Sequence, residues 1–221
     1  MVFAFNDQSS SLDISYWLFN FLRFLGIVTI ALIVHMGAKM LFARRYAASV
    51  THEIWKINRV WFKKKLAYPL HVGAFIPILI TIFSNGQLFF PAIFSSKIDI
   101  KPAYRIGRAY EVLSLYEIAK IKATGIIANV LFAIVLTIIN KTLFADWILV
   151  NAMLAIAYIV PLPKLEGLDI LYGSKVVYLF TLIFVLSAAF LLNFIGGFAT
   201  LILGIVFAVI GVLIHLNNWS K

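Results

Sequence analysis

The most constraining feature of this sequence lies near its C-terminus, where residues 176–220 contain no Asp, Glu, Lys or Arg. One crossing of a bilayer takes about 20 residues of helix, so this stretch is long enough for two crossings. The whole chain shares the bias, with 63% hydrophobic and 13% charged residues. A soluble domain carries about 25% charged residues. The sequence therefore predicts a multi-pass membrane protein.

Apolar segments divide the chain into about five crossings. The expected spans are residues 14–43, 121–141, 147–160, 168–192 and 198–215. A further run at 71–83 measures only about 20 Å as a helix, and a turn signal, Ser-Asn-Gly, follows at 84–86. We expect residues 71–94 to form a short membrane hairpin that enters and leaves on one side. The predicted fold is an all-α polytopic membrane protein with about five transmembrane helices and this hairpin, in one domain of residues 1–221.

Positive charge gathers in two loops. Residues 44–70 and 95–116 together hold eleven Lys and Arg, whereas the polar N-terminal tail 1–13 holds none. Cytoplasmic loops of membrane proteins are enriched in Lys and Arg, so both loops are expected to be cytoplasmic. An odd number of spans then places the N-terminus outside and the C-terminus in the cytoplasm, and we expect the plasma membrane. This orientation explains the net charge of +10 without nucleic acid as a partner.

Several polar side chains lie within or beside the apolar segments, where a charge costs about 2.5–3.5 kcal/mol on insertion scales. These candidates are His35, Lys39, Asn129, Asn151, Glu166, Asp169 and Lys175. His35 and Lys39 are four residues apart and share a helix face. Asn129 and Asn151 are expected to form hydrogen bonds between helices. Asp169 and Lys175 are expected to cap and flank the helix that follows Gly167.

Three short motifs occur in order: HMGAK at 35–39, GIIAN at 125–129 and PLPKLEG at 161–167. They resemble the His-Glu-x-x-His, Gly-Pro-x-x-Asn and Pro-x-Pro-x-Leu-Asp-Gly motifs of the site-2 protease family of intramembrane zinc metalloproteases. Residues 101–108 are similar to the approach to the second motif in archaeal-type members. The resemblance implies a three-helix core, made of the helices that carry the first two motifs and the helix that follows the third.

The motif positions depart from those that zinc chemistry requires. Met36 stands at the position of the general base, and a thioether does not take a proton from water. Lys39 stands at the position of the second ligand, and its ammonium has no lone pair. Glu166 replaces the aspartate of the third motif, so His35 and Glu166 are the only residual metal candidates. We therefore expect no catalytic residue, no zinc and no other cofactor.

The family's groove accepts a transmembrane segment that partly unwinds, and the resemblance places Asn129, Tyr158, Pro161 and Pro163 along it. The resulting hypothesis is a catalytically inactive pseudoprotease that binds membrane-spanning segments of client proteins. Two alternatives stay open. One is an active intramembrane zinc metalloprotease with altered ligands, and the other is a transporter or channel component on the same scaffold.

The position that the zinc ion occupies in the family leads to one hypothesis about the geometry of this chain. A buried carboxylate without a partner is costly, and Lys39 lies where its ammonium would reach Glu166. We expect these two residues to form an ion pair, with His35 within hydrogen-bond distance. The alternative is that Lys39 snorkels to the cytoplasmic surface. A second His-Glu pair at residues 52–53 lies in a basic loop and is interpreted as unrelated to the motif.

Overall fold

The computed structural model of the chain describes residues 14–60, 64–83, 90–100 and 113–219. The helices are α1 (Ile14–Ala43), α2 (Val72–Phe83), α3 (Leu115–Asn140), α4 (Ala145–Ile159), α5 (Glu166–Gly173), α6 (Lys175–Phe194) and α7 (Gly197–Trp219), with a 3-10 helix η2 (Arg44–Tyr46). The strands are β1 (Ala48–Ile54), β2 (Ile57–Val60), β3 (Lys64–Leu70) and β4 (Phe94–Ile100). Three predictions fall outside the described residues, namely the tail 1–13, the turn 84–86 and the segment 101–108.

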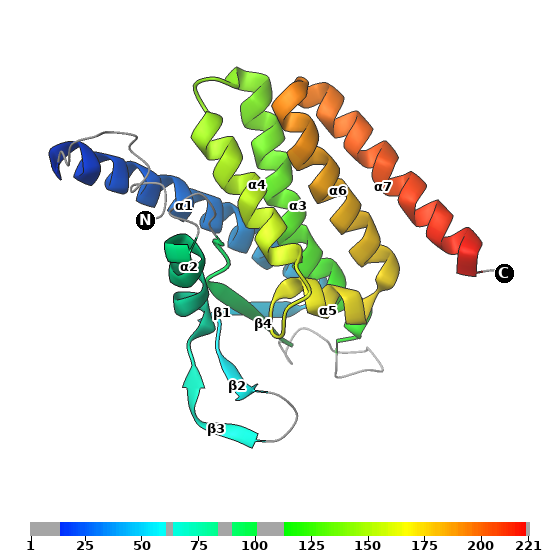
Figure 1. Cartoon of the computed structure of the whole chain (residues 1–221). Helices are drawn as coiled ribbons and strands as arrows, with labels where there is room; N and C mark the ends of the chain where they lie inside the picture. Colours follow the sequence, from blue (N-terminus) through cyan, green and yellow to red (C-terminus); the bar gives the residue numbers. More distant parts are fainter. Residues whose placement is uncertain (1–13, 61–63, 84–89, 101–112, 220–221) are drawn as a thin grey trace.

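Helices α3, α4, α6 and α7 lie side by side, and α1 crosses this group obliquely near one end (Figure 1). The strands, α2 and α5 gather at that end, where α1 finishes and α3 begins. The β2–β3 hairpin extends away from the helices (Figure 1). The arrangement places polar loops and strands at one end of an otherwise apolar bundle.

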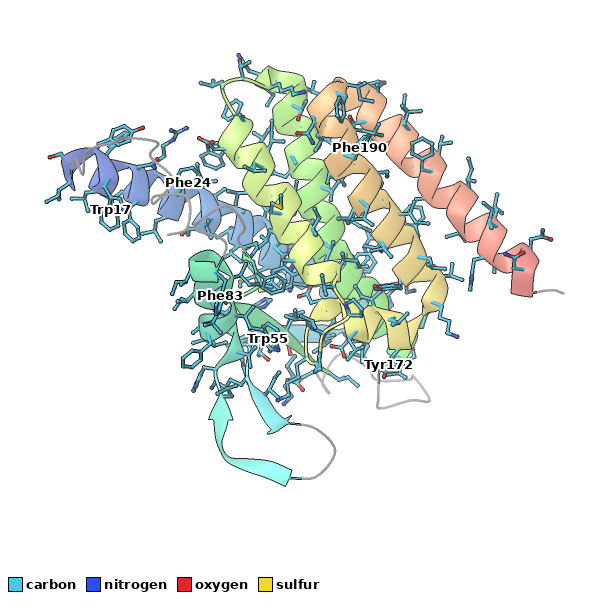
Figure 2. The ribbon with its side chains drawn as sticks, in the orientation of Figure 1. Trp17, Phe24, Trp55, Phe83, Tyr172 and Phe190 are labelled. Carbon is cyan, nitrogen blue, oxygen red and sulfur yellow. The ribbon has the colours of Figure 1, made fainter. Side chains whose placement is uncertain are left out.

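Four helices, α1, α3, α6 and α7, are long and apolar enough to cross a membrane. Large apolar side chains project outward from them, as Phe190 does on α6 at 64% exposure (Figure 2). The chain is therefore a multi-pass membrane protein, as predicted. Helix α4 is apolar but has only 15 residues, or about 22 Å, against a hydrocarbon core of about 30 Å. The described residues thus contain four full-length spans rather than the five that we expected.

Two predicted helix boundaries are corrected by side-chain caps. Helix α3 begins ahead of the expected residue 121, because Ser114 and Glu117 form a capping box in which each side chain accepts a hydrogen bond from the other residue's backbone N–H. The span expected at 168–192 is divided into α5 and α6 at Ser174. Its hydroxyl accepts a hydrogen bond from the backbone N–H of Val177 and so caps α6.

The basic loops expected at 44–70 and 95–116 contain strands, so the all-α prediction is wrong for them. Strand β1 pairs antiparallel with β4, and β2 pairs antiparallel with β3. The second half of β4, KIDI at residues 97–100, alternates in the way typical of a half-buried strand. Its partner β1 lies far away along the chain, and α2 intervenes. That distance is why the sequence pattern alone does not reveal the pairing.

Both ends of the predicted hairpin at residues 71–94 meet at Trp55. The backbone N–H of Gly73 donates to the Trp55 carbonyl at 3.0 Å, and the Trp55 N–H donates to the Ile93 carbonyl at 2.9 Å. A Cβ at Gly73 would lie 2.2 Å from the Ile93 oxygen, so only glycine allows this approach. The two ends of the segment therefore lie together, which is the geometry that the predicted hairpin requires.

Candidate functional site

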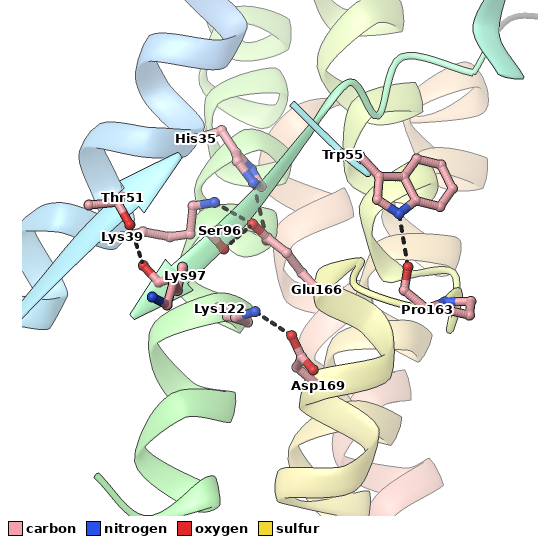
Figure 3. A network of polar contacts seen from close by, with 10 residues as sticks. All are labelled: His35, Lys39, Thr51, Trp55, Ser96, Lys97, Lys122, Pro163, Glu166 and Asp169. Atoms are coloured by element: carbon pink, nitrogen blue, oxygen red, sulfur yellow. Dashed lines mark hydrogen bonds and ion pairs between the residues drawn. The ribbon is translucent and has the colours of Figure 1, made fainter. Parts of the chain in front are cut away.

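A buried ion pair joins the end of α1 to the start of α5. The Lys39 ammonium donates a hydrogen bond to Glu166 Oε1, and the two side chains are 2% and 1% exposed. Figure 3 shows both side chains meeting between α1 and α5. The hypothesis of a Lys39–Glu166 ion pair is confirmed. The alternative, in which Lys39 snorkels to the cytoplasmic surface, is wrong.

Two further side chains surround the Glu166 carboxylate. The Ser96 hydroxyl on β4 donates to Oε1 at 3.0 Å, and His35 Nε2 lies 3.2 Å from Oε2. The His35 contact has the distance of an ion pair, but neither atom has a hydrogen-bond partner among the described residues. Burial by itself would raise the pKa of the Glu166 carboxyl, which lies outside the four spans. The charges of Lys39 and His35 outweigh burial, so this pKa is lowered below its ordinary value.

Lys39, Glu166, Ser96 and His35 form one buried cluster, and helices α3 and α4 complete its walls. A Cβ at Gly125 on α3 would lie 2.8 Å from Lys39 Cγ and 2.9 Å from the His35 carbonyl oxygen, so glycine lets α1 pack directly on α3. The Tyr158 ring on α4 stacks on the His35 ring, with centroids 4.4 Å apart. The Tyr158 hydroxyl accepts a hydrogen bond from the backbone N–H of Phe94 at 3.3 Å. Five elements therefore hold the cluster: α1, α3, α4, α5 and β4.

The double-proline segment between α4 and α5 positions the start of α5. Prolines cannot continue the backbone hydrogen bonds of α4, so the helix ends and the chain turns. The indole N–H of Trp55 donates to the Pro163 carbonyl at 2.8 Å and ties the turn to the strands. A Cβ at Gly167 would lie 2.1 Å from the Ile159 carbonyl oxygen, which shows how closely α5 approaches α4. The Pro161 and Pro163 side chains are themselves exposed.

A second ion pair lies beside the first and joins α3 to α5. Lys122 contacts Asp169, with side chains 5% and 40% exposed. Asp169 and Glu166 both lie in the first turn of α5, three residues apart. The two ion pairs therefore lie on one face of that short helix (Figure 3). The N-cap of α5 is Leu165 and no side chain caps this helix, so the capping role expected of Asp169 is wrong, and Asp169 pairs with α3 instead. Lys175 begins α6, as its expected flanking role requires.

Strand β1 contributes a histidine that the sequence analysis set aside. His52 is the cross-strand partner of Ser96, and partners in an antiparallel ladder project from the same face. His52 therefore faces the cluster that Ser96 contacts. Both of its ring nitrogens are buried and have no hydrogen-bond partner among the described residues. Burial and the nearby Lys39 charge lower the pKa of His52 to about 4.

The two asparagines do not form the hydrogen bonds expected between helices. Asn129 is fully buried on α3, and neither its amide nitrogen nor its oxygen has a partner among the described residues. The Asn151 amide donates to the Trp147 carbonyl one turn earlier in α4, at 2.8 Å. A short polar side chain within a helix commonly satisfies itself in this way. Met36, which stands at the position of the general base in the motif, is half-buried on α1.

The zinc ion that the resemblance implies does not fit the residues present. Within the described ranges, no group of three or more His, Asp or Glu side chains is placed to hold a metal ion. Lys39 donates to the carboxylate that would be a ligand. An ammonium offers no lone pair and repels a cation, whereas a zinc site requires at least three protein ligands.

In comparisons with known proteins, no family model, no curated protein and no solved structure matches this chain.

Proposed function

We propose that the chain is a site-2-protease-like membrane protein in which an internal lysine takes the place of the catalytic metal. It binds membrane-spanning segments of client proteins and does not cleave them. The observation that carries this proposal is the convergence of His35, Lys39 and Glu166 in one buried cluster, although Lys39 and Glu166 are 127 residues apart in sequence. The motif resemblance predicts this convergence, and the convergence therefore supports the proposal.

The chemistry of the cluster supports binding rather than hydrolysis. Peptide hydrolysis needs a base that takes a proton from water near neutral pH. Glu166 accepts hydrogen bonds from Lys39 and Ser96, and its lowered pKa makes it a weak base. Met36 cannot replace it, because a thioether is not basic.

Buried polar groups without partners support the binding of an unwound segment. Neither the nitrogen nor the oxygen of the Asn129 side-chain amide has a hydrogen-bond partner among the described residues. A buried polar group without a partner costs about 1–3 kcal/mol. A transmembrane segment that loses helical structure exposes backbone N–H and C=O groups, which satisfy such side chains on binding.

Metal analysis tests the loss of peptidase chemistry. The purified protein should hold no stoichiometric zinc, and the variant Met36→Glu with Lys39→His and Glu166→Asp should acquire zinc. A matched control with Met36→Gln, Lys39→Gln and Glu166→Asp disturbs the same positions without restoring the ligand set. Stoichiometric, chelator-removable zinc in the wild type would overturn the proposal. Unchanged metal content in a well-folded triple variant would overturn the placement of the motifs.

Peptide binding tests the client hypothesis. In lipid nanodiscs, a labelled transmembrane peptide with a central Gly-Pro pair should bind more tightly than an all-leucine peptide, because the first unwinds readily. Asn129→Leu should reduce this preference, as measured by fluorescence anisotropy. Equal binding of the two peptides by the wild type would count against the proposed clients.

The proposal includes the expected orientation, with the N-terminus outside, the C-terminus in the cytoplasm and the protein in the plasma membrane. The sequence contains no cysteine, so one introduced cysteine gives an unambiguous label. Lys97 on β4 is 69% exposed and suits this substitution. Labelling of Lys97→Cys by an impermeant reagent in intact cells would contradict the orientation.

A further inference from the structure

A cleft of about 710 Å³ lies next to the buried cluster. Its walls come from β1, β4, α3, α5 and the loop before α5, and Ser96 connects it to Glu166. Its charged lining residues are Lys56, Lys97, Lys122, Lys164, Glu53 and Asp169. The lysines outnumber the carboxylates by two, so the cleft favours an anion. Figure 3 shows three of these residues, Lys97, Lys122 and Asp169, beside the cluster.

Two of the four lysines already form ion pairs with carboxylates. Lys122 pairs with Asp169, and Lys97 lies 3.7 Å from Asp99. Lys56 and Lys164 form no ion pair with any described residue. These two ammonium groups are available to an incoming anion.

The backbone at Lys164 has a left-handed conformation, with φ of 66°. Residues other than glycine rarely adopt this region, because their Cβ atom is crowded there. Glycine would relieve the crowding, but it would remove an ammonium from the lining of the cleft. Strained residues of this kind concentrate at functional sites. The conformation therefore points to a role for the Lys164 side chain rather than for its backbone.

Apolar side chains also line the cleft and remain exposed. Leu115 and Tyr172 are 64% and 74% exposed. Leu115 is the first residue of the membrane-spanning helix α3, so the cleft lies level with one end of a span. Lipid headgroups lie at that level of a bilayer. The combination of ammonium groups with an apolar wall at this depth matches an anionic amphiphile.

We propose that this cleft binds the phosphate of an anionic phospholipid headgroup, with Lys56 and Lys164 as its principal cationic contacts. Basic pockets beside the ends of transmembrane helices bind such headgroups in general. The volume of the cleft falls within the range of about 300–1,000 Å³ that small-molecule sites occupy. An acidic peptide would not need the apolar wall at the end of a span. The site shares Ser96 with the Lys39–Glu166 ion pair, but the proposal does not depend on the client hypothesis.

Lipid titration of the full-length purified protein tests the proposal. Native mass spectrometry in detergent should show tighter binding of phosphatidylglycerol than of phosphatidylcholine. The double variant Lys56→Gln with Lys164→Gln should weaken phosphatidylglycerol binding by about 30-fold, since one lysine near a lipid surface contributes roughly fivefold. Phosphatidylcholine binding should change little.

Two variants separate a headgroup site from a general effect of charge or folding. Arg44→Gln with Arg45→Gln removes the same charge at the same end of the molecule but outside the cleft, and it should keep the preference for phosphatidylglycerol. Lys164→Gly should weaken phosphatidylglycerol binding without lowering the melting temperature, because it relieves the strained backbone.

Three results would overturn the proposal. The first is an equal loss of binding in the arginine variant. The second is glycerol phosphate in solution binding as tightly as the lipid, which would make this a site for a soluble phosphate ester. The third is binding of an acidic peptide in the absence of any preference for phosphatidylglycerol.

Discussion

Helix α1 carries an ion pair in each half, and the two pairs have opposite surroundings. Lys39 pairs with Glu166 at side-chain exposures of 2% and 1%, whereas Arg23 pairs with Asp146 at 49% and 33%. Pairs exposed to water contribute about 0.2–1 kcal/mol, and Asp146 lies in the first turn of α4, at the end of the bundle opposite the strands. Removing one member of a buried pair costs about 3–5 kcal/mol, because the other charge is left uncompensated. Similar chemistry therefore constrains the fold strongly at one end of α1 and weakly at the other.

The buried pair also differs in what surrounds it. Glu166 has Ser96 and His35 within 3.2 Å, so its carboxylate connects a strand and two helices. The exposed pair joins only α1 and the first turn of α4. A buried ion pair is weak evidence for stability compared with apolar packing, but it specifies which groups meet. We infer that Lys39 and Glu166 select the position of α5 against α1.

The largest expected effect comes from separating the buried charges. Lys39→Met or Glu166→Gln alone should lower the free energy of unfolding by about 3–5 kcal/mol. The double variant should cost less than either single one, because no uncompensated charge remains. Equilibrium unfolding of the purified protein in mixed micelles measures the coupling between the two sites. Additive losses would show that the two charges do not act as a pair.

A smaller effect should follow from pushing α1 away from α3. In Gly125→Ala, the new Cβ would lie 2.8 Å from Lys39 Cγ and 2.9 Å from a backbone oxygen, so α1 must shift. Overpacking of this kind costs about 1–3 kcal/mol. The matched control is Gly37→Ala on α1, where no atom lies within 4 Å of the added Cβ. A similar loss of stability in both variants would refute the close contact at Gly125.

The exposed pair should tolerate substitution. Arg23→Met and Asp146→Asn should each change the free energy of unfolding by about 0.2–1 kcal/mol, and their effects should nearly add. The same unfolding measurement applies, with Lys39→Met as the reference. A loss at Arg23 as large as that at Lys39 would remove the distinction between the two halves of α1.

The last effect concerns the dependence of stability on pH near the buried pair. The pKa of His52 is lowered from 6.5 to about 4 in the folded protein. As the pH falls, the unfolded chain therefore protonates this histidine at a higher pH than the folded protein does. Its contribution to stability is complete above pH 6.5 and is lost as the pH falls towards 4. His52→Gln should flatten the decline in melting temperature across this interval. Glu166, whose pKa is lowered below 4.5, should add a further loss only at more acidic pH. An unchanged pH profile in His52→Gln would place the histidine away from the cluster.

Sequence reasoning reached the central pair of the site but not its surroundings. Lys39 and Glu166 were matched because a buried carboxylate requires a cation, and the motif resemblance indicated which one. Ser96 and His52 were missed because their role depends on the pairing of β1 with β4. The alternating sequence of β4 was a usable signal for a strand, but not for its partner.

By itself, the sequence determined the membrane class of the protein and the meeting of the two ends of residues 71–94. Both follow from local composition, since the cost of placing charge in a bilayer depends on residue type and on the length of each apolar run. Only the tertiary structure decided that α4 is short, that the expected span 168–192 is divided at Ser174, and that the basic segments form strands. These features depend on caps and on contacts between distant segments, whose free energy exists only once the partners have met.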